Sequence, residues 1–149
     1  MASAILTREN GPFKYDVYLG FGVCDLQTML RLQEKLEQRD ILCYPKYNAG
    51  YLQQSVKSAV VEGVARSRKC LLYVSQAFIE DQLYKYEMAE VLYKVRRFSR
   101  DMLIILKDPQ LARVPPELQT YCVLTITDLS RLENPGFVDN IAAALKKGM

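Results

Sequence analysis

Short apolar runs alternate along the chain with stretches in which hydrophobic residues recur every three or four positions. The apolar runs are rich in branched and aromatic side chains, which suit a buried pleated surface, so they predict strands. Five strands are predicted, at residues 15–20, 41–44, 70–75, 102–107 and 121–127. Strands that alternate with helices are typical of a parallel sheet covered on both faces. The pattern therefore predicts an α/β, flavodoxin-like three-layer fold, with five parallel strands in the order 2-1-3-4-5.

Four helices are predicted between and after these strands. Asp25 stands where it would cap the first helix, the second follows Gly50, and the third covers residues 78–97. Asn134 followed by Pro135 is a typical start for the last helix. Each helix carries one apolar stripe, formed by Leu26, Met29, Leu32 and Leu36, by Leu52, Val56, Ala59 and Gly63, by Tyr84, Met88, Val91 and Val95, and by Phe137, Ile141, Ala144 and Leu145. We expect these stripes to pack against the sheet.

The composition fits one globular domain. The chain has 149 residues, of which 50% are hydrophobic and 25% are charged, enough to bury a single core. We expect an N-terminal extension at residues 1–13 and one domain at residues 14–149. The 20 Lys and Arg residues against 17 Asp and Glu residues leave a net charge of only +3, spread along the chain. This balance argues against nucleic acid as a partner, since a protein that binds a phosphate backbone needs a basic face.

Histidine is absent from the sequence, which excludes catalytic triads that use imidazole and metal sites with histidine ligands. The four cysteines have no C-x-x-C spacing and lie in or beside apolar runs, as expected of reduced thiols in a cytoplasmic protein. We therefore expect neither a metal nor a bound cofactor. No apolar run approaches the roughly 20 residues that cross a bilayer, and the first residues do not resemble a signal peptide.

Two possible phosphate-related motifs are incomplete. Residues 20–25 begin like a dinucleotide-binding fingerprint, but Asp25 occupies the third glycine position. A carboxylate there would repel a pyrophosphate, so a tight turn between strand and helix is the better interpretation. The third predicted strand ends in Val74 and Ser75 rather than in an acidic residue, which argues against a phosphoacceptor site.

Two segments are candidates for surface contacts, and each allows two interpretations. Residues 94–100 form a basic cluster at the end of a predicted helix, either a solvated helix end or a patch for a partner or an anionic lipid. Tyr44, Tyr47 and Tyr51 crowd one predicted loop. Exposed aromatic side chains are costly unless they pack or bind, so these three are either packing residues or interface anchors.

The sequence resembles the Toll/interleukin-1 receptor (TIR) domain family over nearly the whole chain, from about residue 14 to residue 147. The sequence YDVYLGF at residues 15–21 is similar to the first box of that family, with Gly20 where serine is usual. The sequence RKCLLYVSQAF at residues 68–78, followed eight residues later by the pair that ends in Glu87, resembles a further stretch typical of the family.

The other two boxes depart from the family pattern. The sequence PKYNAG at residues 45–50 keeps the glycine of the second box but lacks its aspartate and proline. The Phe-Trp pair of the third box is reduced to Phe137 and Val138. The resemblance is to the animal receptor and adaptor type, and it implies the same flavodoxin-like fold that the hydrophobic pattern predicts.

The resemblance implies, as one function, an innate-immune signalling module that associates with other TIR domains, including further copies of itself. In such proteins the contacts involve the third helix and the loop after the second strand. The corresponding interface residues in this sequence are Tyr44, Pro45, Lys46, Tyr47, Asn48, Ala49, Gly50 and Tyr51.

The resemblance also implies an alternative, an NAD+ glycohydrolase with Glu87 as the catalytic carboxylate and NAD+ as the substrate. The residues that would contact the ligand are Phe21, Gly22, Lys46 and Ser75. The family's phosphate-binding arginines are replaced here by Gly22 and Val23, and its tryptophan before the glutamate by Leu83, which leaves Lys46 as the cation of the neighbouring loop. A diphosphate would lose its hydration with little return, so the sequence favours assembly over catalysis. A non-catalytic nucleotide sensor is a third possibility.

Overall fold

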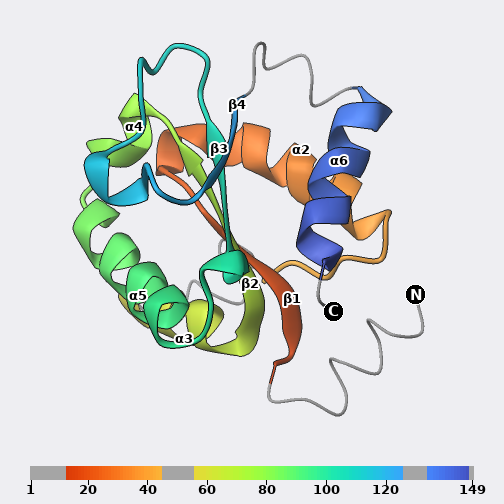
Figure 1. The fold of residues 1–149 in the computed structure, drawn as a ribbon, viewed down its shortest axis with the longest axis horizontal. Coiled ribbons are helices and arrows are strands. Elements are labelled where there is room, and N and C mark those ends of the chain that lie inside the picture. Colours follow the sequence, from red (N-terminus) through yellow and green to blue (C-terminus); the bar gives the residue numbers. More distant parts are fainter. Residues whose placement is uncertain (1–12, 45–55, 126–133, 148–149) are drawn as a thin grey trace.

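The computed structural model describes residues 13–44, 56–125 and 134–147. Its centre is a parallel sheet (Figure 1) whose strands are β1 (Tyr15–Gly20), β2 (Ser67–Val74), β3 (Leu103–Lys107) and β4 (Cys122–Thr125). The strands lie in the order β1-β2-β3-β4, so that β2 and β3 are internal. Because all the pairs are parallel, the four strands begin at one end of the sheet and terminate at the other.

The second predicted strand is not formed as a strand in the described part of the chain, so the sheet has four strands and not the predicted five. The segment at residues 41–44 makes a single parallel bridge, between Cys43 and Val17 of β1. The backbone N–H of Leu42 donates instead to the carboxylate of Asp16, at 2.8 Å. The Asp16 side chain thus accepts a hydrogen bond that a backbone carbonyl would accept in a regular sheet, which interrupts the pairing with β1.

Helices cover both faces of the sheet (Figure 1). On one face lie α2 (Leu26–Glu37) and α6 (Pro135–Lys146), and on the other lie α3 (Val56–Arg66) and α5 (Tyr84–Arg97). The predicted start of the last helix is confirmed, because the Asn134 side chain accepts a hydrogen bond from Gly136 N at 2.8 Å. Among the described helices, none has a run of apolar residues that would reach across a bilayer.

The third predicted helix is wrong in one respect, since residues 78–97 do not form one continuous helix. They are divided between α4 (Gln76–Ile79) and α5. The Asp81 carboxylate between them accepts hydrogen bonds from the backbone N–H of Leu83, at 2.9 Å, and of Val23, at 3.1 Å. An aspartate that bonds the backbone two residues further on favours a turn over a helix. The break orients the first turn of α5 toward the end of β1.

Gly63 lets α3 approach the sheet closely. A Cβ atom at this position would lie 2.6 Å from the ring of Tyr18 and 2.7 Å from the ring of Tyr44. Real Cβ atoms are not found at such distances, so a larger residue would displace one of the rings. The glycine therefore leaves the space that the Tyr18 ring occupies, and the hydroxyl group of Tyr18 is part of the site described next.

Candidate functional site

Glu87 lies in the first turn of α5, beneath the end of β1, and its side chain is only 1% exposed. The hydroxyl group of Tyr18, from β1, donates a hydrogen bond to Oε2 of Glu87. Gly20 is a close neighbour, because a Cβ atom built on it would be 3.5 Å from the carboxyl carbon of Glu87. The structure thus brings together the glutamate and the first-box glycine that the sequence analysis singled out.

A carboxylate buried to this degree needs hydrogen-bond donors, since the loss of hydration costs several kcal/mol when nothing replaces it. Tyr18 supplies one such donor, and Tyr18 is itself fully buried. A phenol paired with a carboxylate is also an arrangement that can bind the hydroxyl groups of a sugar or stabilise a developing positive charge. In the conformation described, Glu87 would have to become accessible before it could do either.

A second polar group lies at the same edge of the sheet, around Ser75. Its Oγ donates to Oδ2 of Asp25 at 2.6 Å and accepts from the backbone N–H of Phe78 at 3.1 Å, so it caps α4. Burial raises the pKa of Asp25, the Ser75 hydrogen bond opposes this, and the nearby Asp108 carboxylate adds to it. Burial, followed by the charges of Asp108 and Asp25, also raises the pKa of Tyr73.

The sequence analysis predicted that the Asp25 side chain caps its own helix, and this prediction is wrong. Asp25 does occupy the N-cap position of α2, but its side chain makes no capping hydrogen bond there. Its carboxylate accepts a hydrogen bond from the Ser75 hydroxyl group instead, which connects the start of α2 to the end of β2. The Asp108 charge that helps to raise the pKa of Asp25 also makes this edge unfavourable for an anionic ligand.

Three of the four predicted ligand-contact residues lie at the ends of β1 and β2, and all three make internal contacts. Phe21 is 6% exposed and belongs to the core beneath α2. Gly22 lies against the backbone of Ala77, because a Cβ atom built on it would be 2.9 Å from the Ala77 carbonyl oxygen. Ser75 makes the two hydrogen bonds given above, and Lys46 lies outside the described residues. Their role toward a ligand stays a prediction.

Tyr44 is the one residue of the predicted interface that falls within the described residues. It is 1% exposed, and its ring lies 5.0 Å from that of Tyr15 and 6.1 Å from that of Tyr18. Of the two interpretations given for this residue, packing is the one that the structure supports. The other predicted interface residues, Pro45, Lys46, Tyr47, Asn48, Ala49, Gly50 and Tyr51, lie outside the described residues.

The basic cluster at residues 94–100 is not uniformly solvated. Lys94 is 5% exposed, and its ammonium group donates to the carbonyl oxygens of Val64, at 2.6 Å, and Ser67, at 2.5 Å. These carbonyls lie at the C-terminal end of α3, where a cation is stabilised by the helix dipole. Burial lowers the pKa of Lys94. Arg96 and Arg97 remain exposed.

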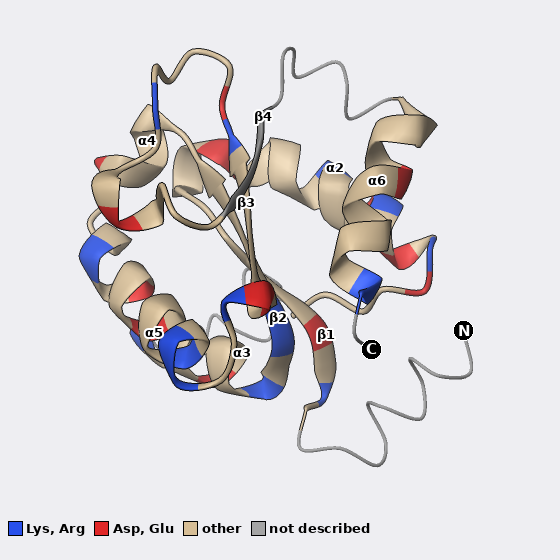
Figure 2. Cartoon of the chain, viewed as in Figure 1, with Lys and Arg blue, Asp and Glu red and all other residues tan. Residues whose placement is uncertain are grey.

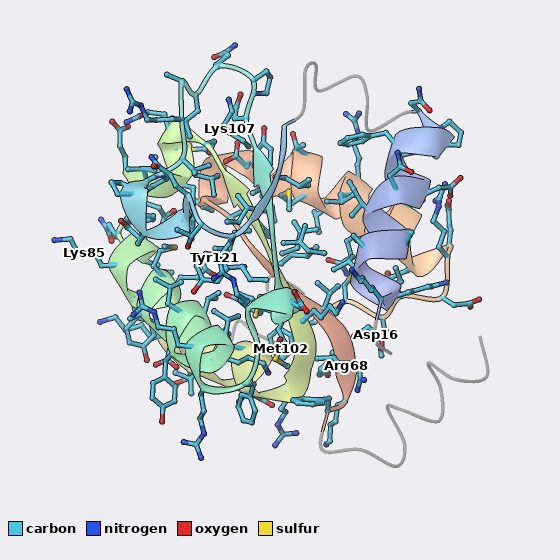
Figure 3. The ribbon with its side chains drawn as sticks, viewed as in Figure 1. Asp16, Arg68, Lys85, Met102, Lys107 and Tyr121 are labelled. Atoms are coloured by element: carbon cyan, nitrogen blue, oxygen red, sulfur yellow. The ribbon has the colours of Figure 1, made fainter. Side chains whose placement is uncertain are left out.

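The sequence analysis did not anticipate an aromatic patch at α5, the helix from which Lys85 points outward in Figure 3. Tyr93 is 63% exposed and Phe98 is 62% exposed, and Val61 of α3 is 40% exposed beside them. Arg97 donates to the Tyr93 hydroxyl group at 3.0 Å and lies 5.7 Å from the Phe98 ring. We call these four residues the α5 patch; they line a groove of about 360 Å³ between α3 and α5. The available signal was Tyr93, an aromatic residue off the buried stripe of its helix.

Comparison with solved structures shows what this arrangement is similar to. The TIR domain of the Toll-related receptor TRR-2 from Hydra magnipapillata matches with a TM-score of 0.69 and 18% identity, over 89% of this chain and 99% of that one. A TIR-STING receptor from C. gigas, solved in complex with 2',3'-cGAMP, matches with a TM-score of 0.73 and 17% identity over 93% of this chain. A second structure of a C. gigas TIR-STING receptor gives a TM-score of 0.68 at 17% identity, over 94% of this chain.

The extent of these matches differs between the relatives. The chain spans 41% and 43% of the two C. gigas receptor chains but nearly all of the Hydra domain. No protein-family model matches the sequence, and the search of curated proteins gave no match either. The fold is therefore established by three-dimensional similarity, at sequence identities of 17–18%.

Proposed function

We propose that this chain, which has the fold of a TIR domain, is a signalling module that acts by associating with other TIR domains, including further copies of itself. The observation that carries the proposal is the α5 patch, in which Tyr93 and Phe98 expose more than half of their surface. Aromatic side chains and arginine are the residue types most enriched at the energetic centres of protein interfaces. The patch lies on α5, which is the helix that the family resemblance assigns to assembly.

The patch is also ordered in a way that lowers the cost of binding. The hydrogen bond from Arg97 to Tyr93 and the contact of Arg97 with Phe98 hold three long side chains in place before a partner arrives. A side chain that is already immobilised loses less conformational entropy on association. The patch is small, so we expect weak contacts that depend on concentration or on tethering to an oligomeric partner.

The experiment is sedimentation velocity over a range of protein concentrations, with a double variant Tyr93→Ala and Phe98→Ala. We expect self-association to weaken at least about tenfold, since removal of two central aromatic anchors costs more than 1 kcal/mol each in typical interfaces. Leu30→Ala is the matched control, because Leu30 is a 38% exposed apolar residue on α2, across the sheet. Self-association that is unchanged in the double variant would contradict the proposal.

The sequence analysis adds a second contact region, the predicted loop at residues 44–51, of which Tyr44 is buried and therefore not a contact residue. Charge reversal at Lys46 together with Tyr47→Ala tests it in the same sedimentation experiment. We expect association to weaken while the thermal unfolding curve stays nearly unchanged. Equal association of this variant and the parent would remove the loop from the interface.

The proposal places the module in the cytoplasm, in innate-immune signalling. The free thiols of Cys43 and Cys70 are buried in the core, which fits a protein that folds where thiols stay reduced. The pathway follows from the family resemblance alone.

One observation favours a second function, an NAD+ glycohydrolase. Glu87, which matches the family's catalytic glutamate, is buried beside the Tyr18 hydroxyl group and the glycine that ends β1. The test is the release of nicotinamide from NAD+ at high protein concentration, comparing the parent with Glu87→Gln. Product that forms with the parent and not with the variant would establish the activity. Absence of product, or equal product from both proteins, would exclude Glu87 catalysis.

A further inference from the structure

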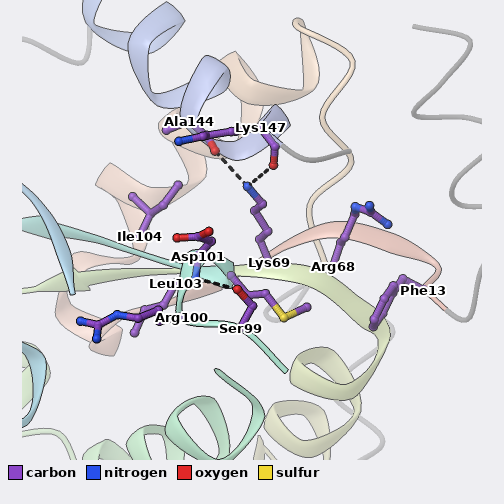
Figure 4. A pocket seen from close by; sticks show the side chains of 11 residues that line it. Phe13, Arg68, Lys69, Ser99, Arg100, Asp101, Leu103, Ile104, Ala144 and Lys147 are labelled. Atoms are coloured by element: carbon purple, nitrogen blue, oxygen red, sulfur yellow. Dashed lines mark hydrogen bonds between the residues drawn. The ribbon is translucent and has the colours of Figure 1, made fainter. Parts of the chain in front are cut away.

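A cavity of about 580 Å³ lies at the opposite end of the sheet from Glu87, where β2 and β3 begin (Figure 4). Its walls come from the start of β2, the end of α6 and the 3-10 turn η3 (Arg100–Met102) that leads into β3. Its volume falls within the range of small-molecule sites, which is about 300–1,000 Å³. Neither the family resemblance nor the proposed assembly function makes use of this cavity.

Positive charge predominates in the lining. Four cationic residues, Arg68, Lys69, Arg100 and Lys147, face a single carboxylate, that of Asp101. Figure 4 shows Lys69 pointing from β2 to the end of α6, with Asp101 on one side and Arg68 on the other. The Arg100 guanidinium group points away from Lys69 and donates to the Thr120 carbonyl oxygen. The cationic residues whose charges act on Lys69 are Arg68 and Lys147.

Lys69 is the central feature because its ammonium group is buried and only partly paired. The residue is 6% exposed, and it donates to the carbonyl oxygens of Ala144, at 3.1 Å, and Lys147, at 2.5 Å. An ammonium group has three N–H donors, so one is left for an acceptor beyond these two carbonyls. Burial lowers the pKa of Lys69, and the Asp101 charge opposes this. An anion in the cavity would offset the same loss of hydration more completely than the distant carboxylate does.

Apart from Ser99, the rest of the lining is apolar. Phe13, Met102, Leu103, Ile104 and Ala144 are the apolar residues that line the cavity. Phe13 is also within 4.6 Å of the Lys94 ammonium group, which helps to fix its ring. A wall of this kind favours a ligand that combines an anionic group with a flat, apolar part.

We propose that this cavity binds a small phosphorylated ring compound of the nucleoside phosphate class, with its phosphate groups toward Lys69, Arg68 and Lys147 and its ring against Phe13 and Met102. A phosphate group carries a charge of about −1.5 to −2 at pH 7 and offers three acceptor oxygens, which suits several converging cations better than a carboxylate would. The opposite end of the sheet, where the strands terminate, is called the carboxyl edge below. It has the carboxylates of Asp25, Asp108 and Glu87 and lacks this complementarity.

The experiment is isothermal titration calorimetry of the full chain with two probes, ADP and inorganic pyrophosphate, at low and high salt. We expect ADP to bind more tightly than pyrophosphate, since only ADP has a ring for the apolar wall. Binding of both probes should weaken at high salt, because the partly exposed cations are screened. Arg68→Gln should weaken ADP binding about tenfold or more, the typical loss for one charge-assisted hydrogen bond.

Three results would overturn the proposal: no binding of either probe at millimolar concentration, unchanged ADP affinity in Arg68→Gln, or an equal loss in Lys85→Gln. Lys85 is an exposed cation on α5 that is not part of the cavity lining, so its variant controls for net charge. Equal affinity for ADP and pyrophosphate would overturn the assignment of the ring to the apolar wall. Lys147→Gln provides a second variant at the rim, because Lys147 is exposed and its replacement leaves the core intact.

Discussion

The two ends of the parallel sheet differ in the charged side chains that gather there, and Lys and Arg residues are concentrated where β2 begins (Figure 2). Where the strands end, the carboxylates of Asp25, Asp81, Glu87 and Asp108 outnumber the ammonium group of Lys107, which bonds the loop after β3. Where the strands begin, the cations of Arg68, Lys69, Lys94 and Arg100 outnumber the carboxylates of Asp16 and Asp101. Both ends belong to one sheet and one core, so the difference arises from what surrounds the strand ends.

Helix polarity explains the difference. In a parallel α/β fold the helices run antiparallel to the strands. Helix N-termini therefore gather at the carboxyl edge, and helix C-termini gather where the strands begin, which we call the amino edge. Lys69 and Lys94 donate to the last carbonyls of α6 and α3 respectively. Asp25 precedes α2, and Glu87 occupies the first turn of α5. Cations are stabilised at helix C-termini and anions at helix N-termini, which is the distribution observed.

The same charge arrangement separates the two candidate activities. An anionic ligand is favoured at the amino edge, whereas the carboxyl edge has a buried carboxylate suited to a positively charged or hydroxyl-bearing group. In open α/β sheets the carboxyl edge is the usual place for ligands. The amino-edge cavity of this chain therefore has to be tested apart from the Glu87 site, and the variants below alter one edge at a time.

The largest effect is expected from Lys94→Met at the amino edge. The change removes the ammonium group that bonds Val64 and Ser67, and it leaves two buried carbonyl oxygens without this partner. We expect the free energy of unfolding to fall by about 3 kcal/mol, since an unpaired buried polar group costs about 1–3 kcal/mol. Urea denaturation measures the loss, and Lys85→Met on the exposed side of α5 is the control.

A loss in Lys94→Met no larger than that in Lys85→Met would contradict the capping role of Lys94. It would also show that the basic amino edge is a consequence of surface charge alone. Helix polarity would then no longer account for the difference between the two edges.

A smaller effect is expected at the carboxyl edge, from Tyr18→Phe. This variant keeps the ring against Gly63 but removes the hydroxyl donor to Glu87. We expect the free energy of unfolding to fall by about 1–2 kcal/mol, the cost of one lost hydrogen bond to a buried charged group. In the double variant Tyr18→Phe with Glu87→Gln, most of this loss should be recovered, because the buried charge is gone. Additive losses in the double variant would show that the two groups are not coupled.

Much of the fold could be predicted from the sequence, because it depends on local patterns. The runs at residues 15–20 and 102–107, the apolar stripe of α2 and the cap at Asn134 all follow from periodicity or from one side chain bonding its own neighbourhood. The TIR fold itself follows from the same patterns together with the family boxes. These features require no knowledge of distant contacts.

The rest depends on contacts between residues far apart in the chain. The single bridge at Cys43 in place of a strand involves Asp16, and the break between α4 and α5 involves Val23. The burial of Lys94 depends on the end of α3, 27–30 residues away. Likewise, the amino-edge cavity assembles from four separate segments. Local propensity carries no information on which distant carbonyl a lysine will reach.

The smallest effect is expected from Asp25→Asn, which sharpens the comparison by its pH dependence. The pKa of Asp25 is raised in the folded protein, mainly by burial, so folding favours its protonated form. In the parent, stability from this group is fully present below the unfolded pKa of about 3.8 and is lost as the pH rises through the higher folded pKa. Asparagine is neutral throughout, and its side-chain oxygen can still accept a hydrogen bond from the Ser75 hydroxyl group. We therefore expect the variant to be more stable than the parent at pH 7, by less than about 1 kcal/mol because the site is partly solvated. This advantage should disappear on acidification to about pH 3.5.

Urea denaturation of the parent and of Asp25→Asn at both pH values measures the difference. An advantage that is equal at the two pH values would show that charge repulsion at the carboxyl edge does not act through Asp25.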